Sequence, residues 1–279
     1  MEMIKELPIF SLLSEIEERQ VVQEKEGIEI CPKHGEYKCN ISVLKNGEEI
    51  KSECPECKKE REQEEEKRQK EKAEKKENER IQKNIAFGNI EIDYQNLTFD
   101  DYKAETVQQE RAAQAVKDIV ERKKKKVVLL GETGLGKTML GSLAVKYMGG
   151  KIYRMYDIAT MIRQSYSYNA KRTELEIVEE LSSLPLLVID EVGKVGNSEA
   201  VRNWMSAIID KRHTRKLPLI LAGNLHIISE CKHREQGGCS ECFENYFTKD
   251  VLSRLTEDTT IVIMRGKDHR NLKNFNLYK

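Results

Sequence analysis

The sequence predicts an α/β fold with a parallel five-stranded sheet in the longer, C-terminal part of the chain, preceded by a small separate module and a charged linker. Three observations support this prediction. Apolar runs rich in Val, Ile and Leu alternate with helical stretches from residue 127 to residue 264, which is typical of parallel sheets covered on both faces. Residues 58–83 hold 20 charged side chains among 26 residues, so they cannot build a core. Ahead of them, cysteine and histidine occur in pairs separated by two residues.

The composition limits the possible classes of protein. Of the 279 residues 38% are apolar, enough for a core in only part of the chain. Lys+Arg and Asp+Glu number 48 each, so the whole-chain charge does not argue for a nucleic-acid or membrane partner. No apolar run approaches about 18 residues, and residues 1–10 lack the basic start of a signal peptide. We expect a cytoplasmic protein with no membrane partner, whose seven cysteines are thiols or metal ligands.

The N-terminal module, residues 1–57, is expected to contain a zinc ribbon. Two pairs of x₂ spacing flank a hairpin pattern, in which residues 37–43 alternate in polarity, Asn46-Gly47 indicates a two-residue turn, and residues 48–52 return as a strand. Zn²⁺ takes four nitrogen or sulfur ligands, and a module this small lacks the core to fold without such a crosslink. The predicted ligands are Cys31, His34, Cys54 and Cys57. Cys39 is the alternative to His34, although its place on an apolar strand face favours a buried side chain.

An amphipathic helix is predicted upstream of the ribbon, with Ile9, Leu12, Leu13 and Ile16 on one face. It either packs on the ribbon or docks into a groove of a partner protein.

Residues 58–84 are expected to form a charged linker. The stretch contains Glu and Lys or Arg in the favourable i,i+4 order, for example Glu64–Arg68 and Glu66–Lys70. A solvated single helix is therefore expected, with a disordered linker as the alternative.

The third region, residues 85–279, is expected to carry the parallel sheet. We predict strands at 127–130, 151–156, 185–190, 217–223 and 260–264, with helices after each of the first four. The first of these strands runs directly into G-x-x-x-x-G-K-T, a P-loop. Its backbone amides cradle phosphates, Lys137 reaches the β- and γ-phosphates, and the Thr138 hydroxyl ligates Mg²⁺. The predicted ATP-binding residues are Gly131, Glu132, Thr133, Gly134, Leu135, Gly136, Lys137 and Thr138.

Two further strand ends carry polar side chains suited to ATP hydrolysis. The strand at 185–190 ends in Asp190 and Glu191, which are expected to hold the hydrated Mg²⁺ and to polarise the attacking water, respectively. The next strand is followed by Asn224, an amide placed to orient that water. The order of these residues after the P-loop predicts an ATPase.

Together with Arg254 downstream, these features resemble the AAA+ ATPases. From about residue 80 to the C-terminus the chain resembles more closely the DnaC/IstB-like group of helicase loaders and transposition helper ATPases. The matching stretches are Leu97–Tyr102, Gly131–Thr138, Ile189–Gly193, Ile208–Arg212, Ala222–Leu225 and Leu252–Leu255. The resemblance implies that Arg254 is an arginine finger acting on the ATP of a neighbouring subunit, and that Arg270 senses nucleotide.

The same resemblance implies a function. The preferred interpretation is a protein that oligomerises in its ATP state and loads a DnaB-type replicative helicase onto single-stranded DNA. The alternative is a transposition helper that binds duplex DNA and a transposase, and a third class is a nucleotide-dependent adaptor with little hydrolysis. The N-terminal module favours the loader, and the intact Asp190-Glu191 pair counts against the adaptor.

The segment between Asn224 and Arg254 departs from the usual pattern of that group. Its spacing permits a second zinc site formed by Cys231, His233, Cys239 and Cys242. Free thiols in a polar loop are the alternative.

Overall fold

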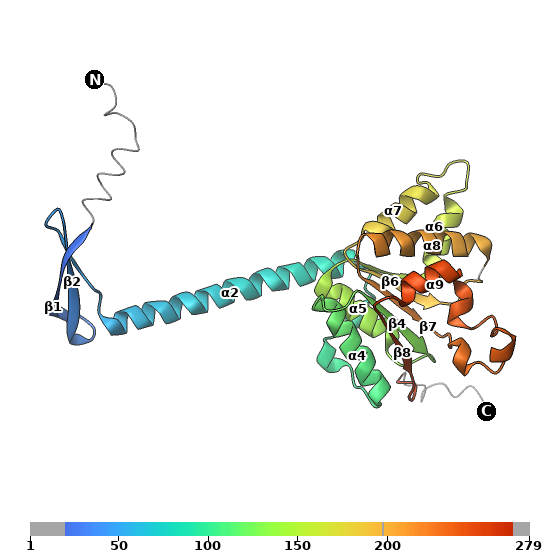
Figure 1. Cartoon of the computed structure of the whole chain (residues 1–279), viewed down its shortest axis with the longest axis horizontal. Helices are drawn as coiled ribbons and strands as arrows, with labels where there is room; N and C mark the ends of the chain where they lie inside the picture. Colours follow the sequence, from blue (N-terminus) through green and yellow to red (C-terminus); the bar gives the residue numbers. More distant parts are fainter. Residues whose placement is uncertain (1–19, 197, 270–279) are drawn as a thin grey trace, which may run out of the picture. The chain divides into compact units, whose positions relative to one another are not determined.

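The computed structural model describes residues 20–196 and 198–269 (Figure 1). The predicted N-terminal helix at residues 9–16 and the nucleotide-sensing Arg270 lie outside these residues. The chain divides into two compact units, Met1–Glu77 and Asn78–Lys279. Among the described helices, none has the length and apolar character needed to cross a membrane.

The first unit contains an antiparallel sheet in the order β1-β2-β3. Its strands are β1 (Val21–Cys31), β2 (Gly35–Leu44) and β3 (Glu49–Lys51). The Asn46-Gly47 turn joins β2 to β3, and Gly47 adopts a φ of +86°, which suits glycine. Strand β1 is a difference from the sequence-based prediction, which had no strand before Cys31. Cys39, in the middle of β2, is 1% exposed.

Helix α2 (Pro55–Phe87) begins immediately after Cys54 and runs for 33 residues. Proline suits the first turn of a helix because no intrahelical partner exists there for its missing N–H. None of the α2 residues is buried, so charge pairs on its surface, such as Glu66–Lys70 at 2.8 Å, take the place of core packing. The helix extends a few residues beyond the predicted linker at both ends.

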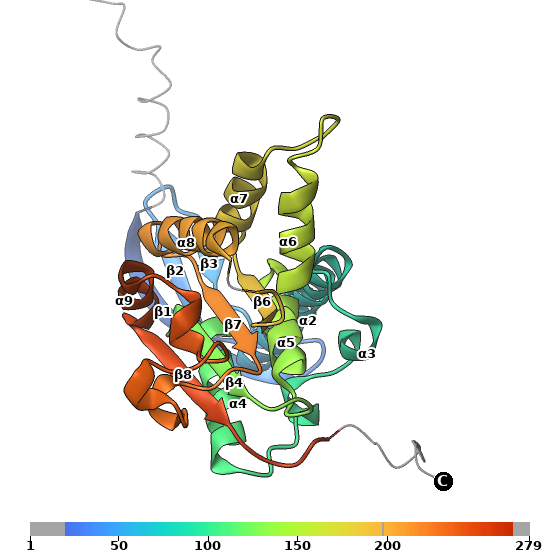
Figure 2. The same cartoon turned by 90° about the vertical axis from the view of Figure 1, so that its right-hand side faces the viewer.

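The second unit is built on a five-stranded parallel sheet in the order β5-β6-β7-β4-β8 (Figure 2). The strands are β4 (Lys126–Gly131), β5 (Lys151–Arg154), β6 (Leu187–Val192), β7 (Leu219–Gly223) and β8 (Thr259–Met264). All five lie where the sequence predicts strands. Strand β5 ends at Arg154 rather than 156, because Met155, Ile158 and Ile162 are buried along one face of the helix that follows.

Helices cover both faces of this sheet. They are α3 (Ile92–Gln95), α4 (Val107–Val120), α5 (Lys137–Met148), α6 (Met155–Gln164), α7 (Glu174–Ser183), α8 (Glu199–Thr214) and α9 (Lys249–Thr256), with short 3-10 turns η1 (Phe99–Asp101), η2 (Ile228–Glu230), η3 (Arg234–Gln236) and η4 (Phe243–Tyr246).

The side chains of β4 alternate between two cores. Val128 and Leu130 pack in the cluster that includes α6, α7, α8 and α9, while Val127 and Leu129 pack in the cluster that includes α4 and α5. Strand β4 lies between β7 and β8, and β6 lies beside β7. Because these strands are parallel, their carboxyl ends meet at one edge, where open α/β sheets bind ligands.

Candidate functional site

The loop between β4 and α5 has the backbone conformation that phosphate binding requires. Gly136 caps α5 in the left-handed conformation with φ +80°, and a Cβ at this position would lie 2.5 Å from the Tyr102 ring. Only glycine fits both conditions. The loop amides and the N-terminus of α5 therefore form a cradle suited to anionic oxygens.

Lys137, Thr138 and Asp190 lie at the base of this cradle. The Lys137 Nζ donates hydrogen bonds to the carbonyl oxygens of Gly131 at 2.7 Å and Glu132 at 2.5 Å. The Thr138 hydroxyl donates to Oδ2 of Asp190 at 2.6 Å. Burial raises the pKa of Asp190, and the hydrogen bond from Thr138 opposes that shift. A hydroxyl and a carboxylate in contact are the hard oxygen ligands that Mg²⁺ prefers, so these residues fit the ion that accompanies ATP.

Glu191 and Asn224 line the same cavity as the P-loop, which has a volume of about 390 Å³. Glu191 has a φ of +56°, a strained conformation for a non-glycine residue of the kind that concentrates at functional sites. Its Oε1 accepts a hydrogen bond from the Lys194 ammonium at 2.8 Å. The chain thus brings an acidic and an amide side chain to the cavity that the P-loop lines.

The sequence did not single out seven of the residues that line this cavity: Tyr94, Asp101, Tyr102, Lys103, Met139, Lys194 and His269. The Tyr102 hydroxyl donates to the Leu135 carbonyl at 3.1 Å, and burial raises the pKa of Tyr102 to about 12. The backbone N–H of His269 donates to the Gly134 carbonyl at 3.0 Å. Asp101 and Tyr102 close the Leu97–Tyr102 stretch that carries the family resemblance, and this was the available signal for them. The other five had none.

Arg254 does not line the cavity of its own chain. It lies on α9, where its guanidinium forms an ion pair with Asp210 of α8 at 2.6 Å. The neighbouring Asp210 carboxylate raises the pKa of Arg254, whose side chain is 47% exposed.

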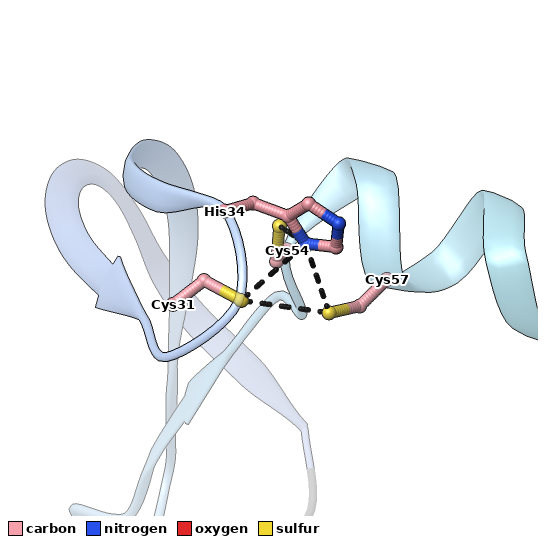
Figure 3. Close-up of side chains that lie close together, drawn as sticks. All are labelled: Cys31, His34, Cys54 and Cys57. Carbon is pink, nitrogen blue, oxygen red and sulfur yellow. Dashed lines mark hydrogen bonds between the residues drawn. The ribbon is translucent and has the colours of Figure 1, made fainter.

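The first Cys/His cluster joins the turn after β1 to the start of α2 (Figure 3). The ligand atoms of Cys31, His34, Cys54 and Cys57 all lie within 4.8 Å of one another. The two sulfurs of Cys31 and Cys57 are 3.5 Å apart, and His34 Nδ1 lies 3.4 Å from the Cys57 sulfur. Around a tetrahedral zinc such separations are about 3.8 Å and about 3.6 Å. The cluster contains His34 and leaves out the alternative, Cys39.

Neighbouring groups prepare this cluster for a cation. The N–H groups of Lys33 and His34 lower the pKa of the Cys31 thiol to about 6, which favours the thiolate that binds metal. The second ring nitrogen of His34, Nε2, lies 3.2 Å from Oε1 of Glu60 on α2. A carboxylate in this position fixes the orientation of a metal-bound imidazole. The donor set therefore fits Zn²⁺.

The second cluster corrects the sequence-based ligand set. The structure brings Cys231, Cys239 and Cys242 together with His226 rather than with the predicted His233. The backbone N–H of His233 donates to the Cys231 sulfur at 3.4 Å and lowers the pKa of that thiol to about 6. The turn that aims this amide at the sulfur leaves the rest of His233 exposed. His226 reaches the cluster because the chain after β7 forms a parallel bridge with Cys242.

Comparison with known proteins agrees with this geometry. Residues 61–275 match the family of IstB-like ATP binding proteins. The chain belongs to this family. Its P-loop, sheet and cavity are those of a DnaC/IstB-like AAA+ ATPase, as the sequence motifs predicted.

The curated relatives are replicative helicase loaders. The chain is 27% identical over 154 residues to the replicative helicase loader DnaC of Buchnera aphidicola from Acyrthosiphon pisum, covering 52% of this chain and 63% of the relative. The DnaC protein of Escherichia coli K12 is 25% identical over 147 residues, covering 50% and 60%. The chain thus spans less than two thirds of the length of these relatives.

Solved structures of replication proteins are also similar. The crystal structure of the DnaC helicase loader is 22% identical and aligns with 63% of this chain and 100% of its own, with a TM-score of 0.48. AMPPCP-bound DnaA from Aquifex aeolicus is 19% identical and aligns with 68% and 58%, with the same TM-score. At this similarity the fold assignment rests on the strand order and the P-loop of the chain itself.

Proposed function

We propose that this protein is an ATP-hydrolysing loader that delivers a DnaB-type replicative helicase onto single-stranded DNA. The observation that carries the proposal is the single cavity lined by the P-loop, Asp190, Glu191 and Asn224, in a chain whose curated relatives are named replicative helicase loaders. Those relatives do not favour the transposition helper.

In the proposed reaction, each cavity residue has a separate task. Bound Mg²⁺·ATP supplies the phosphoryl group and the charge compensation that phosphoryl transfer requires. Lys137 leaves its two loop carbonyls to contact the β- and γ-phosphates, and Thr138 and Asp190 hold the metal. Glu191 accepts a proton from the attacking water, and Asn224 donates a hydrogen bond that orients that water.

Hydrolysis in trans is part of the proposal. Arg254 is half-exposed and outside its own cavity, so in the ATP-state oligomer it contacts the γ-phosphate held by a neighbouring subunit. A positive group supplied in this way stabilises charge that develops in the transition state. ATP hydrolysis then requires that subunits assemble into an oligomer. This requirement suits a protein that changes its oligomeric state while it delivers a helicase.

The proposed single-stranded DNA surface is formed by α6 and the loop before α7. Tyr156, Tyr166 and Tyr168 are 57%, 63% and 103% exposed, and the Arg163 guanidinium lies 5.6 Å from the centre of the Tyr156 ring. Lys171 is exposed in the same loop. Aromatic faces interleaved with cations bind single strands by stacking and charge, with little sequence preference.

The proposed helicase handle is the N-terminal module, residues 1–57, folded around one Zn²⁺ at Cys31, His34, Cys54 and Cys57. Val22, Ile28 and Ile30 of β1 are 60%, 70% and 73% exposed. Exposed aliphatic side chains gathered on one strand mark a surface for protein contact.

The test is a loading assay with the DnaB-type helicase of the source organism and a single-stranded DNA covered by single-strand binding protein. The full chain with ATP should allow the helicase to unwind an adjoining duplex, and the Lys137→Ala chain should not. A chain that leaves unwinding unchanged and does not capture the helicase in a pulldown refutes the proposal. Capture of a transposase instead supports the transposition helper.

A further inference from the structure

The segment between β7 and α9 holds a second group of metal-ligating side chains, separate from the N-terminal cluster. Nε2 of His226 lies 3.4 Å from the Cys239 sulfur and 3.3 Å from the Cys242 sulfur. The sulfurs of Cys239 and Cys242 are 3.9 Å apart, and the Cys231 sulfur lies within 4.8 Å of the other three ligand atoms. These separations are those of donors around one tetrahedral zinc, about 3.6 Å for N···S and about 3.8 Å for S···S.

The backbone of this segment is shaped around the sulfurs. The N–H of Cys239 donates to the Cys242 sulfur at 3.2 Å, and the N–H of His233 donates to the Cys231 sulfur at 3.4 Å. Gly238 has a φ of +87°, and a Cβ there would lie 2.7 Å from the Cys242 sulfur. The regular structure of the segment is limited to the short turns η2, η3 and η4. Between His226 and Glu241 only Cys231 is buried, so a crosslink among the four ligands would hold this part of the segment in place.

The cluster is connected to the nucleotide cavity at two points. His226 follows Asn224 by two residues, and the intervening Leu225 packs on Gly193, two residues after Glu191. From the other side of the cluster, the Tyr246 hydroxyl donates to the Gly193 carbonyl at 2.9 Å. The two sides are joined by backbone hydrogen bonds, including one of 2.8 Å from the Phe243 N–H to the His226 carbonyl.

We infer that His226, Cys231, Cys239 and Cys242 bind one structural Zn²⁺, which holds Asn224 and the turn after Glu191 in position. The ion crosslinks the end of β7 to the residues before α9, so its loss frees the segment that carries the water-orienting amide. The effect on turnover rests on the proposed ATPase activity, whereas the metal content does not.

The first measurement is the zinc content of the full chain by elemental analysis after purification without chelator. His226→Ala and Cys239→Ser should each lower it by one ion per chain. His233→Ala is the matched control and should leave it unchanged, and His226→Cys, which keeps a metal-binding side chain, should retain the ion. Loss of zinc in His233→Ala but not in His226→Ala overturns the ligand set. A zinc content that neither His226→Ala nor Cys239→Ser lowers overturns the site, and so does a Cys239–Cys242 disulfide in the purified wild-type chain.

The second measurement tests the connection to the cavity. In His226→Ala, backbone amides of residues 190–194 and 224–226 should exchange with deuterium at least about tenfold faster than in His233→Ala, whether or not the chain hydrolyses ATP. If the chain is an ATPase, kcat should fall about tenfold or more while ATP affinity stays within about twofold, because the P-loop makes the phosphate contacts. Unchanged exchange in a zinc-depleted variant overturns the positioning role. An inactive wild-type chain with the expected zinc and exchange results instead refutes only the proposed function.

Discussion

Replacing Arg254 with alanine separates a catalytic contribution of this residue from a structural one. In the structure Arg254 contacts Asp210, and the two side chains are 47% and 37% exposed. Ion pairs this open to solvent contribute little to stability because water and salt screen them. Arg254→Ala should therefore fold with nearly the thermal midpoint of the wild type, and any large loss of activity must have another cause.

If Arg254 acts on the ATP of a neighbouring subunit, its removal should lower kcat by about 10³–10⁵-fold, the range that arginine fingers supply in phosphoryl transfer. The assay is steady-state phosphate release in the presence of single-stranded DNA, beside ATP binding measured by fluorescence. Binding should be retained, because Arg254 does not line the cavity of its own chain.

Asp210→Ala is the matched control, since it breaks the same ion pair and leaves the arginine in place. Mixing two inactive variants gives a second criterion for action between subunits. Lys137→Ala subunits have no working P-loop but keep Arg254, so adding them to Arg254→Ala subunits should restore part of the activity. The reasoning is refuted if Asp210→Ala loses as much activity as Arg254→Ala, or if the mixture of the two inactive chains stays inactive.

Three further outcomes are expected. Lys137→Ala should lose ATP binding while Glu191→Gln binds ATP without turning it over; equal binding losses, measured by calorimetry, would contradict the separate roles. A fragment of residues 1–77 should fold with one zinc ion, seen by circular dichroism and elemental analysis, whereas residues 1–57 should be less stable because they lack Glu60, the partner of the His34 ring. Hydrogen bonds from Lys211 of α8 and from Arg215, the residue after α8, lower the pKa of Glu179 to about 2, below the unfolded value of about 4.3. Since this folded pKa is depressed, the stabilisation is present above about pH 4 and is lost as the pH falls toward 2. Glu179→Gln should therefore lower the thermal midpoint near pH 7, and the difference from the wild type should disappear near pH 2; a constant difference across that range would contradict the assignment.

The sheet of the second unit was predictable because burial on both faces makes most of its strands apolar, and apolar strands are recognisable in the sequence. Four of its five strands contain an apolar run, β5 being the exception, and β4 alternates between two cores that both exclude water. The same rule explains why the sequence missed β1. There Lys25 and Glu29 pair across β2 with Glu49 and Lys51, while Ile28 and Ile30 on the opposite face are exposed. A strand whose side chains are mostly exposed on both faces gives no recognisable burial pattern, and hydrogen bonds to β2 hold it in place.

The strand-end residues of the cavity were predictable for a topological reason. Once β4, β6 and β7 are parallel neighbours, the side chains that follow them must converge, so Asp190, Glu191 and Asn224 meet the P-loop without any further information. Tyr94 and His269 enter the cavity from outside the sheet. Their positions depend on how the chain folds back before β4 and after β8, which no local pattern encodes.

The choice between His226 and His233 shows where sequence spacing stops being informative. Spacing finds ligands that share one turn, such as Cys239 and Cys242, because the backbone alone brings their sulfurs together. It favoured His233, which lies two residues from Cys231, but at that distance the residue contributes its amide rather than its ring. His226 lies outside the turn and reaches the sulfurs only because the end of β7 directs the chain past Cys242. Since that strand end also carries Asn224, the ligand that spacing could not identify is the one that connects the metal cluster to the nucleotide cavity.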